Sequence, residues 1–475
     1  MKKLFLSLGL LLLALLAILL INTLRLTSKQ VPAEPVEKMA VSDQVFQNLS
    51  KAIQFKTISF NEEAVPDSAE FLGFHRFLEA TFPLVHSQLT LEKINTYSLL
   101  YKWQGTDPSL KPVILMSHQD VVPVDEPTLQ QWEAGPFEGK ITDTHIIGRG
   151  TLDDKGTLMG VLEAVEKLLS ENYVPARTIY IASGHDEEVG GPNGAGMIAE
   201  HLKKQGVQAA MTLDEGGYFA EGLVPGLSGP VAMINLGEKG FASFRLIVRT
   251  NGGHSSAPPK ENTIGILAKA IVDLENNQLP YKLVPPIDAQ LEYLGPELPF
   301  LPRIAFANPW LFKSQLLEGL NAHTTTAPTI IDGGVKNNVI PTVAEATINF
   351  RILPGETIES VQAHIESIVS DKVTVEPVGF LTNPPAVSRV DSEPYRILEK
   401  TIRNLHPETI VVPGLLGGAT DSRYFTEISD EVYRFYPIRI DKESMERFHG
   451  IDEKISKENY KEIIQFSYHL IKNFQ

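Results

Sequence analysis

Short apolar runs alternate with helical patterns along most of this chain, and this alternation constrains its fold more than any other feature. Val113–Met116, Thr178–Ser183 and Ala209–Leu213 have the composition of buried strands. Between them, residues 158–169 place apolar side chains at helical spacing, and residues 197–202 do so more briefly. Strands separated by helices form parallel sheets. The sequence therefore predicts an α/β domain with a mixed, largely parallel sheet.

A second structural unit is predicted inside this domain, over residues 237–380. Its elements follow the order strand, helix, strand, strand, helix, strand over Phe241–Val248, Ile264–Leu274, Thr326–Ile331, Ala344–Ile352, Val361–Val369 and Val373–Val378. This β-α-β-β-α-β order is that of a ferredoxin-like unit. A segment rich in proline and aromatic residues, 280–323, interrupts it. We expect the larger domain to comprise residues 43–236 and 381–475.

The N-terminus carries a long apolar run, Leu4–Ile21. At about 1.5 Å per residue, its 18 residues make a helix of about 27 Å, close to the ~30 Å of a bilayer core. We expect residues 1–30 to form a transmembrane anchor, joined to the body by a linker, 31–42, with the body outside the cytoplasm. The alternative is a signal peptide that is cleaved to give a secreted protein. A small-residue cleavage site does not follow Ile21, which favours the anchor.

Composition excludes several classes of function. The chain has 42 Lys and Arg against 58 Asp and Glu, a formal charge of −16, which argues against a general nucleic-acid binder. It has no cysteine, so disulfides, thiolate zinc sites and cysteine nucleophiles are excluded. A protein-bound metal would need imidazole and carboxylate ligands.

Such ligands follow the ends of three predicted strands and occur in one glycine-rich loop. They are His118 with Asp120, the pair Glu187 and Glu188, Asp214, and Asp153 in the loop. The carboxyl ends of parallel strands meet at one crevice, so these side chains should converge. Carboxylates crowded together repel unless a cation neutralises them. Histidine and carboxylate ligands without cysteine favour zinc, with manganese or cobalt as substitutes.

Local spacing suggests separate roles within this cluster. His118 and Asp120 are two residues apart at a strand end and lie on one face, so Asp120 can fix the imidazole tautomer. Glu187 and Glu188 are adjacent and point differently, so one can bind metal while the other acts as a base.

Eight ordered motifs carry a resemblance to a known family. They are Ser117–Pro123, Gly148–Lys155, Gly184–Glu188, Asp214–Gly217, Gly253–Pro259, Asn338–Pro341, Thr420–Arg423 and His449–Gly450. In these motifs the chain resembles the dinuclear-zinc aminoacylase/carboxypeptidase family of metallopeptidases. Within that family it is similar to the N-fatty-acyl-amino-acid synthase/hydrolases and to the Gly-X carboxypeptidases called carboxypeptidase S. The likeness extends from about Val45 to the C-terminus.

The resemblance implies two zinc ions bridged by Asp153. His118 and Asp214 would complete one metal site, and Glu188 and His449 the other. The peptide bond that follows Asp153 is cis in such relatives.

The resemblance also implies catalytic and substrate-binding roles. Glu187 would be the general base for a zinc-bound hydroxide, and Asp120 the carboxylate that orients His118. In the inserted unit, which acts as a lid and dimerisation domain in relatives, His254 would stabilise the oxyanion, often across a dimer interface. Asn338 and Arg351 would hold the substrate and its carboxylate.

These roles predict hydrolysis of an amide bond to an amino acid with a free carboxylate. One hypothesis is a metallocarboxypeptidase that releases C-terminal residues from short peptides, and another is an N-fatty-acyl-amino-acid hydrolase/synthase. A membrane-anchored binding protein without activity is a third. The apolar groups Leu298–Leu301 and Trp310–Phe312 could line an acyl trough, or serve as a packing arm or dimer contact.

Overall fold

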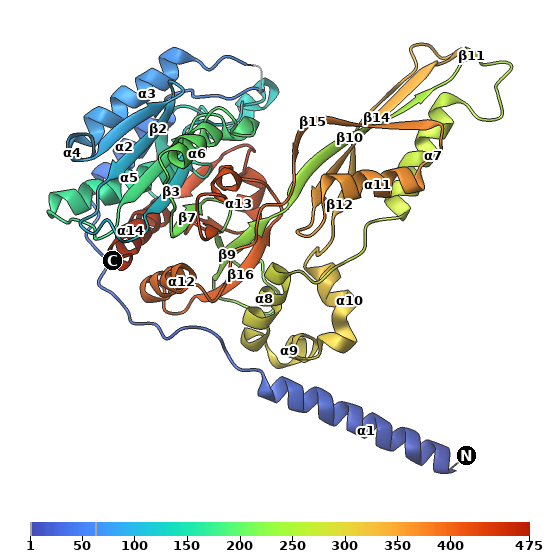
Figure 1. Cartoon of the computed structure of the whole chain (residues 1–475), viewed down its shortest axis with the longest axis horizontal. Coiled ribbons are helices and arrows are strands. Elements are labelled where there is room, and N and C mark those ends of the chain that lie inside the picture. Colours follow the sequence, from blue (N-terminus) through green and yellow to red (C-terminus); the bar gives the residue numbers. More distant parts are fainter. Residues whose placement is uncertain (1, 62–63) are drawn as a thin grey trace.

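The computed structural model describes residues 2–61 and 64–475 and is built around one mixed sheet (Figure 1). In spatial order its strands are β1 (Thr90–Ile94), β2 (Ser98–Trp103), β6 (Ile179–Gly184), β3 (Val113–His118), β7 (Met211–Asp214), β17 (Val432–Arg434), β9 (Val231–Glu238), β8 (Phe219–Ala220) and β18 (Arg439–Ile440), and β16 (Ile410–Leu416) also pairs with β9. The central pairs β6–β3, β3–β7 and β7–β17 are parallel. The predicted α/β class with a largely parallel sheet is confirmed.

Helices cover both faces of this sheet, because the central strands are apolar on both sides. On β3, Val113 and Leu115 enter one core, while Ile114 and Met116 enter the other. The helices packed on the first core are α2 (Gln44–Ile53), α3 (Ser68–Thr81), α4 (Pro83–Gln88), α5 (Lys155–Ser170), α12 (Glu393–Leu405) and α14 (Lys457–Asn473). The second core packs against α6 (Ala195–Lys204). Alternation of side chains along a strand thus builds two layers from one apolar run.

A four-stranded antiparallel sheet extends from the body as an arm (Figure 1). Its strands, in spatial order, are β12 (Thr325–Gly333), β14 (Val343–Ile352), β10 (Gly240–Arg249) and β15 (Val373–Thr382), and α7 (Thr263–Asn276) and α11 (Ile358–Ile368) pack against them. In chain order the elements run β-α-β-β-α-β, the topology of a ferredoxin-like unit. A two-stranded ribbon, β11 (Gly253–His254) with β13 (Val339–Ile340), forms the tip of the arm. The role of the arm as a lid stays a prediction.

The proline-rich segment folds into helices that lie below the arm. They are α8 (Pro285–Leu294), η3 (Gly295–Glu297), α9 (Phe300–Ala307) and α10 (Pro309–Gly319). Helix α8 packs against β16 and β9 of the large sheet. The segment interrupts the arm in sequence but is anchored on the body.

Helix α1 (Lys2–Arg25) projects away from the body, and its side chains are mostly exposed (Figure 1). It is the one helix among the described residues that is long and apolar enough to cross a membrane. It contacts α9, and near its C-terminal end Asn22 donates to the Asn308 side chain at 2.8 Å.

The segment that follows α1 runs along the body through paired hydrogen bonds. The Gln30 side chain donates to the Val411 carbonyl at 2.8 Å and accepts from the Val411 N–H at 2.7 Å. Gln465 makes the same two-way contact with the backbone of Met39, at 2.6 and 3.0 Å. The expected linker thus fixes where α1 emerges from the body.

Smaller elements complete the chain. They are η1 (Glu126–Gln131), η2 (Glu187–Val189), η4 (Asp421–Phe425), α13 (Lys442–Arg447), and the three-stranded sheet of β4 (Lys140–Ile141), β5 (His145–Ile147) and β19 (Lys454–Ser456). This small sheet joins the loop before α5 to the loop after α13, because β5 pairs with β19.

Candidate active site

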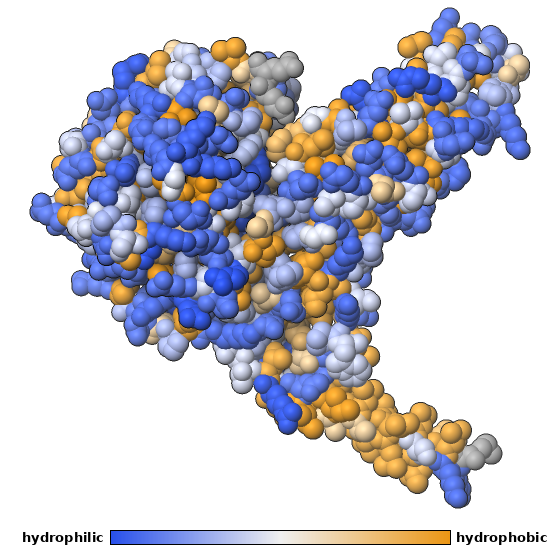
Figure 2. All heavy atoms as spheres, viewed as in Figure 1, coloured by the Kyte–Doolittle hydropathy of each residue, from blue (hydrophilic) through white to orange (hydrophobic). Residues whose placement is uncertain are grey.

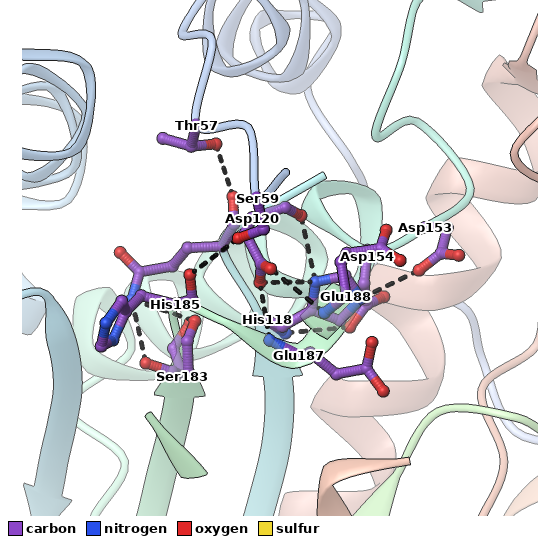
Figure 3. Close-up of polar contacts among 12 residues, drawn as sticks. Thr57, Ser59, His118, Asp120, Asp153, Asp154, Ser183, His185, Glu187 and Glu188 are labelled. Carbon is purple, nitrogen blue, oxygen red and sulfur yellow. Dashed lines mark hydrogen bonds and ion pairs between the residues drawn. The ribbon is translucent and has the colours of Figure 1, made fainter. Parts of the chain in front are cut away.

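The carboxyl ends of the central strands bring predicted acids and an imidazole together, and Figure 3 shows His118, Asp120, Asp153, Glu187 and Glu188 among them. Strand β3 ends at His118 and is parallel to both β6 and β7, so the residues after all three strands lie at one edge. Asp153 reaches the same edge from the loop before α5. His449, nearly 300 residues later in the chain, joins them from the loop after α13.

Asp153 lies between the two imidazoles. Its Oδ1 is 2.9 Å from His118 Nε2, and its Oδ2 is 2.9 Å from His449 Nε2. His449 Nε2 is also 3.3 Å from Glu188 Oε2. One carboxylate with an oxygen toward each imidazole is the arrangement that a bridging ligand needs. The peptide bond between Asp153 and Asp154 is cis, as the resemblance implied.

Asp120 is fully buried and holds two other parts of the site. Its carboxylate lies 3.2 Å from His118 Nδ1, and its backbone carbonyl is 3.0 Å from the same nitrogen. The N–H groups of Glu187 and Glu188 donate to its two carboxylate oxygens, at 3.2 and 3.1 Å. With Nδ1 donating to Asp120, Nε2 of His118 is free to bind a metal. Asp120 thus orients the imidazole and also fixes the turn that carries both glutamates.

The side chains of Asp214 and Glu215 diverge. Asp214 Oδ2 accepts a hydrogen bond from the Ser422 N–H at 2.8 Å. Glu215 Oε1 lies 3.4 Å from His118 Nε2, although the sequence-based ligand set names Asp214 at this position. Ligand atoms of His118, Asp154 and Glu215 form one group that could hold a metal ion, and those of His118, Asp153 and Glu188 form another. Asp214 and Glu215 are adjacent in the sequence, and only the fold shows which of the two faces the imidazole of His118.

Glu453 was not among the residues predicted from sequence, yet it holds the Asp153 loop in place. Its Oε1 accepts hydrogen bonds from the N–H groups of Gly150, Leu152 and Asp153, at 2.9, 2.8 and 3.3 Å. Its Oε2 accepts from Arg149 Nη1 at 2.6 Å. No local sequence signal marks this role, because every partner of Glu453 lies about 300 residues away.

Arg149 joins the same loop to the segment that carries His449. Its Nη2 donates to the backbone carbonyls of His449 and Gly450, at 3.0 and 3.1 Å. His449 adopts a left-handed φ of 56°, an uncommon conformation for a residue other than glycine. The buried Arg149–Glu453 pair therefore sets the distance between two predicted metal ligands.

Negative charge dominates the site. Burial, together with the charge of Asp153, raises the pKa of Glu188 to about 7 and that of Glu215 to about 8. Burial also raises the pKa of Glu187 well above its usual value, and neighbouring carboxylates add to this. Hydrogen bonds to Asp153 and Glu188 raise the pKa of His449 to about 10. Burial is the main cause of the three raised glutamate pKa values, because loss of solvation disfavours the charged carboxylate.

The donor set fits a divalent cation. Oε1 of Glu188 is buried and has no hydrogen-bond partner among the described residues. It lies beside an imidazole and a second carboxylate, the ligand types that zinc accepts in the absence of thiolates.

The predicted substrate-binding residues lie apart from this cluster. His254 on β11 and Asn338 beside β13 are neighbours at the tip of the arm, where the Ser255 N–H donates to the Asn338 carbonyl at 3.3 Å. Arg351 lies at the base of the arm, with its guanidinium 4.7 Å from the centre of the Phe241 ring. Within one chain the fold does not bring His254 to the strand ends.

An α/β sheet with imidazoles and carboxylates gathered at its strand ends defines the class of metal-dependent hydrolases. Residues 114–473 match the model of Peptidase family M20/M25/M40, and the chain belongs to this family. Members of the family normally bind metal ions. The chain is accordingly an amidohydrolase.

Named relatives share most of the chain. It is 41% identical over 483 residues to a probable carboxypeptidase S-like 2 of Dictyostelium discoideum, covering 98% of this chain and 92% of that protein. It is 42% identical over 439 residues to the human N-fatty-acyl-amino acid synthase/hydrolase PM20D1, covering 90% and 86%.

Solved structures of the family show the same fold. The M20 family metallo-carboxypeptidase Sso-CP2 of Sulfolobus solfataricus superposes with a TM-score of 0.68 at 20% identity, over 91% of this chain and 99% of that one. Human carnosine dipeptidase 1 gives a TM-score of 0.61 at 16% identity, over 92% and 100%.

Removal of the Glu453 carboxylate tests its role in the Asp153 loop. Glu453→Ala leaves three backbone donors and Arg149 without their partner, so we expect a loss of about 3–5 kcal/mol in stability. We also expect weaker metal retention, because Asp153 loses its support. Thermal unfolding and elemental analysis after dialysis measure the two effects.

A matched control separates an effect on the Asp153 loop from a general loss of stability. Glu462 forms a comparable ion pair with Arg439 at 2.6 Å, in a contact that does not involve the Asp153 loop. Glu462→Ala should lower the thermal midpoint and leave metal content unchanged. Full metal retention in Glu453→Ala would contradict the assigned role.

Proposed function

We propose that this protein is a metallocarboxypeptidase that releases C-terminal amino acids from short peptides. The observation that carries the proposal is the Asp153 carboxylate, which has one oxygen 2.9 Å from each of two imidazoles. Two divalent ions, zinc with manganese or cobalt as substitutes, fit on either side of it. His118 would hold one ion together with Glu215 or Asp214, and Glu188 and His449 would hold the other.

When bound, two such ions would supply Lewis acidity to the amide carbonyl and would lower the pKa of a bound water. They would also neutralise the carboxylates, whose pKa values are raised mainly by burial and further by neighbouring carboxylates. The ordered contacts around Asp120 and Glu453 keep these ligands in place before substrate binds.

Glu187 is the group placed to move the proton. Its backbone is held by Asp120, its side chain is not a metal ligand in our assignment, and its carboxyl has no dashed contact in Figure 3. It would take a proton from the attacking water and deliver it to the leaving amine, so the amide C–N bond breaks and a free amino group forms. Burial, which raises its pKa, makes the carboxyl a better proton acceptor once it is ionised.

Arg351 is the proposed partner of the substrate carboxylate. It stacks on Phe241, and burial lowers its pKa, so its guanidinium is poorly hydrated. A planar fork of donors in such a setting binds a carboxylate through two parallel hydrogen bonds. This selects amides whose amine part is an amino acid.

A homodimer formed through the arm would bring His254 to an active site. Strand β12 is an edge of the arm sheet, and from Ala327 to its end it is exposed, including Ile330 and Ile331 at 63% and 66%. An exposed apolar edge strand favours pairing with a second copy. In such a dimer the tip of one arm, with His254 and Asn338, would reach the strand ends of the partner and stabilise the oxyanion.

The N-fatty-acyl-amino-acid hydrolase/synthase activity is the second candidate, and an apolar cavity supports it. The cavity measures about 380 Å³, is open to solvent on one side, and is lined by residues 223–225, β9 and the α8–α10 segment. Val231 and Met233 line it from β9, and Asn235, on the same face of that strand, donates to the Gly216 carbonyl at 2.7 Å. The cavity therefore points along β9 toward the loop of Glu215. An acyl chain entering there would leave its amide near the metal ligands.

We further propose that α1 is an uncleaved membrane anchor with the body outside the cytoplasm, and a secreted form after cleavage is the alternative. The contact of α1 with α9 and the ordered segment behind it support this placement. Retention of α1 by the mature chain, read by mass spectrometry of its N-terminal peptide, tests it.

Loss of the Glu187 carboxylate should abolish hydrolysis. Full-length protein with zinc in detergent is given a blocked Gly-X dipeptide and an N-oleoyl amino acid, and released amino acid is quantified. Glu187→Gln should lower the rate by about 10²–10⁴-fold, because the proton carrier is gone. Glu443→Gln, on the exposed helix α13, should match the parent. Equal rates for Glu187→Gln and the parent would refute the mechanism.

Mixed dimers test whether His254 acts on the partner. In a heterodimer of His254→Ala and Glu187→Gln chains, one active site combines the intact Glu187 of the first chain with the intact His254 of the second. We expect about half of the parental rate, from one active site in two. An inactive heterodimer would show that His254 acts within its own chain. A His254→Ala homodimer that matches the parent would show that His254 has no role in catalysis.

Filling the cavity separates the two substrate classes. A Cβ added at Gly319 meets no atom within 4 Å, so Gly319→Phe can project into the cavity without a backbone clash. We expect kcat/KM for the N-oleoyl substrate to fall at least about tenfold, with the Gly-X dipeptide unaffected. Gly229→Phe has equal local space and does not line the cavity, so it serves as the control. An unchanged N-oleoyl rate would remove the support for this second candidate.

A further inference from the structure

The insertion exposes large apolar side chains beside the N-terminal helix. Phe300 and Leu301 on α9 are 49% and 77% exposed, and Trp310 and Leu311 on α10 are 58% and 44% exposed. We call these four residues the insertion patch. Figure 2 shows apolar surface running from α1 onto the α8–α10 helices, while the surface of the main body is largely hydrophilic. Leu298–Leu301 and Trp310–Phe312 were expected to line an acyl trough or to serve as a packing arm or dimer contact, and the four patch residues among them are exposed to solvent.

The same helices are also apolar on their inner side. Leu298, Phe306 and Leu316 line the cavity that borders β9. Helices with apolar side chains on two opposite sides need an apolar environment on both. The body supplies one, and the structure leaves the other uncovered within this chain.

The position of the patch relative to α1 identifies what covers it. Asn22 donates to the Asn308 side chain at 2.8 Å, and Asn308 donates to the Leu19 carbonyl at 3.3 Å. Asn308 is fully buried at the junction of α9 and α10. The junction of the two patch helices is therefore fixed at the last turns of α1, where a membrane-spanning helix leaves the hydrocarbon core.

We propose that the insertion patch enters the bilayer surface that α1 crosses, so that α9 and α10 form a second membrane contact. This proposal rests on α1 being an anchor. Tryptophan beside aliphatic side chains is typical of the membrane interface, and the exposed cations Arg25 and Lys313 lie on the same elements to meet lipid headgroups. The attachment at Asn308 keeps the patch next to the leaflet even as α1 tilts.

The contact has a consequence for substrate entry. Pro302 lies on the exposed side of α9 and also lines the cavity. With the patch embedded, this edge of the cavity meets the acyl region of the leaflet. An amphiphilic N-acyl amino acid dissolved in the membrane could enter by its chain without crossing water.

Trp310 is a built-in probe of the proposed contact. It is 58% exposed, whereas the other two tryptophans, Trp103 and Trp132, are 4% and 8% exposed. The full chain is reconstituted into phosphatidylcholine vesicles with or without a doxyl quencher near the headgroup end of the acyl chains. The emission of Trp310 is the difference between the parent and Trp310→Phe. We expect the quencher to lower it by about half or more, since the patch would lie about 5–10 Å below the surface.

Two variants make the result specific. Leu301→Asp places a charge at the centre of the patch, and because Leu301 is 77% exposed the change does not disturb the core. It should reduce quenching of Trp310, whereas Val174→Asp, at a 57% exposed site on the main body, should not.

Every other outcome overturns the proposal. A chain that floats with the vesicles but shows unquenched Trp310 has an anchor and no second contact. Emission that shifts to the blue with rising protein concentration in detergent, without lipid quenching, shows that a second copy covers the patch. A chain that does not float with the vesicles has neither the anchor nor the second contact. None of these readouts depends on catalysis, so failure of the proposed enzymatic activity is a separate result.

Discussion

Mutual repulsion of buried carboxylates is the constraint on which the rest of this structure depends. Asp153, Glu187, Glu188 and Glu215 lie at one edge of the sheet, where His118 and His449 contact three of them. Buried carboxylates stay ionised only with hydrogen bonds and nearby cations. The fold supplies hydrogen bonds through backbone N–H groups. The remaining negative charge would be neutralised by bound metal ions.

The two side chains that support this arrangement, Asp120 and Glu453, are fully buried. Asp120 and Glu453 each accept hydrogen bonds from two or more backbone N–H groups next to predicted ligands. Each connects loops that are distant in sequence, so the geometry of the site depends on the whole sheet being folded. A binding site for metal is thereby linked to the stability of the large domain.

The arm and the insertion both extend from the body, and each leaves a surface uncovered within the described part of this chain. The arm presents an uncovered edge strand, and the insertion presents an uncovered apolar patch. The composition of the two surfaces differs. The edge strand offers backbone hydrogen bonds to a second copy, whereas the patch joins tryptophan and aliphatic side chains to the end of an apolar helix. The edge strand therefore favours a protein partner, and the patch favours lipid.

The sequence by itself determined the α/β class and the β-α-β-β-α-β order, because both are local patterns, and it predicted site residues that follow the strand ends. It did not determine that Glu215 faces His118, since adjacent acids look alike until a backbone sets their directions. It gave no signal for Glu453, whose partners lie about 300 residues away. It left Trp310 as lining of a trough, a packing arm or a dimer contact, whereas the fold leaves this side chain exposed on α10. Tertiary structure decided these points because the direction of a side chain and contacts across hundreds of residues are set by packing rather than by local pattern.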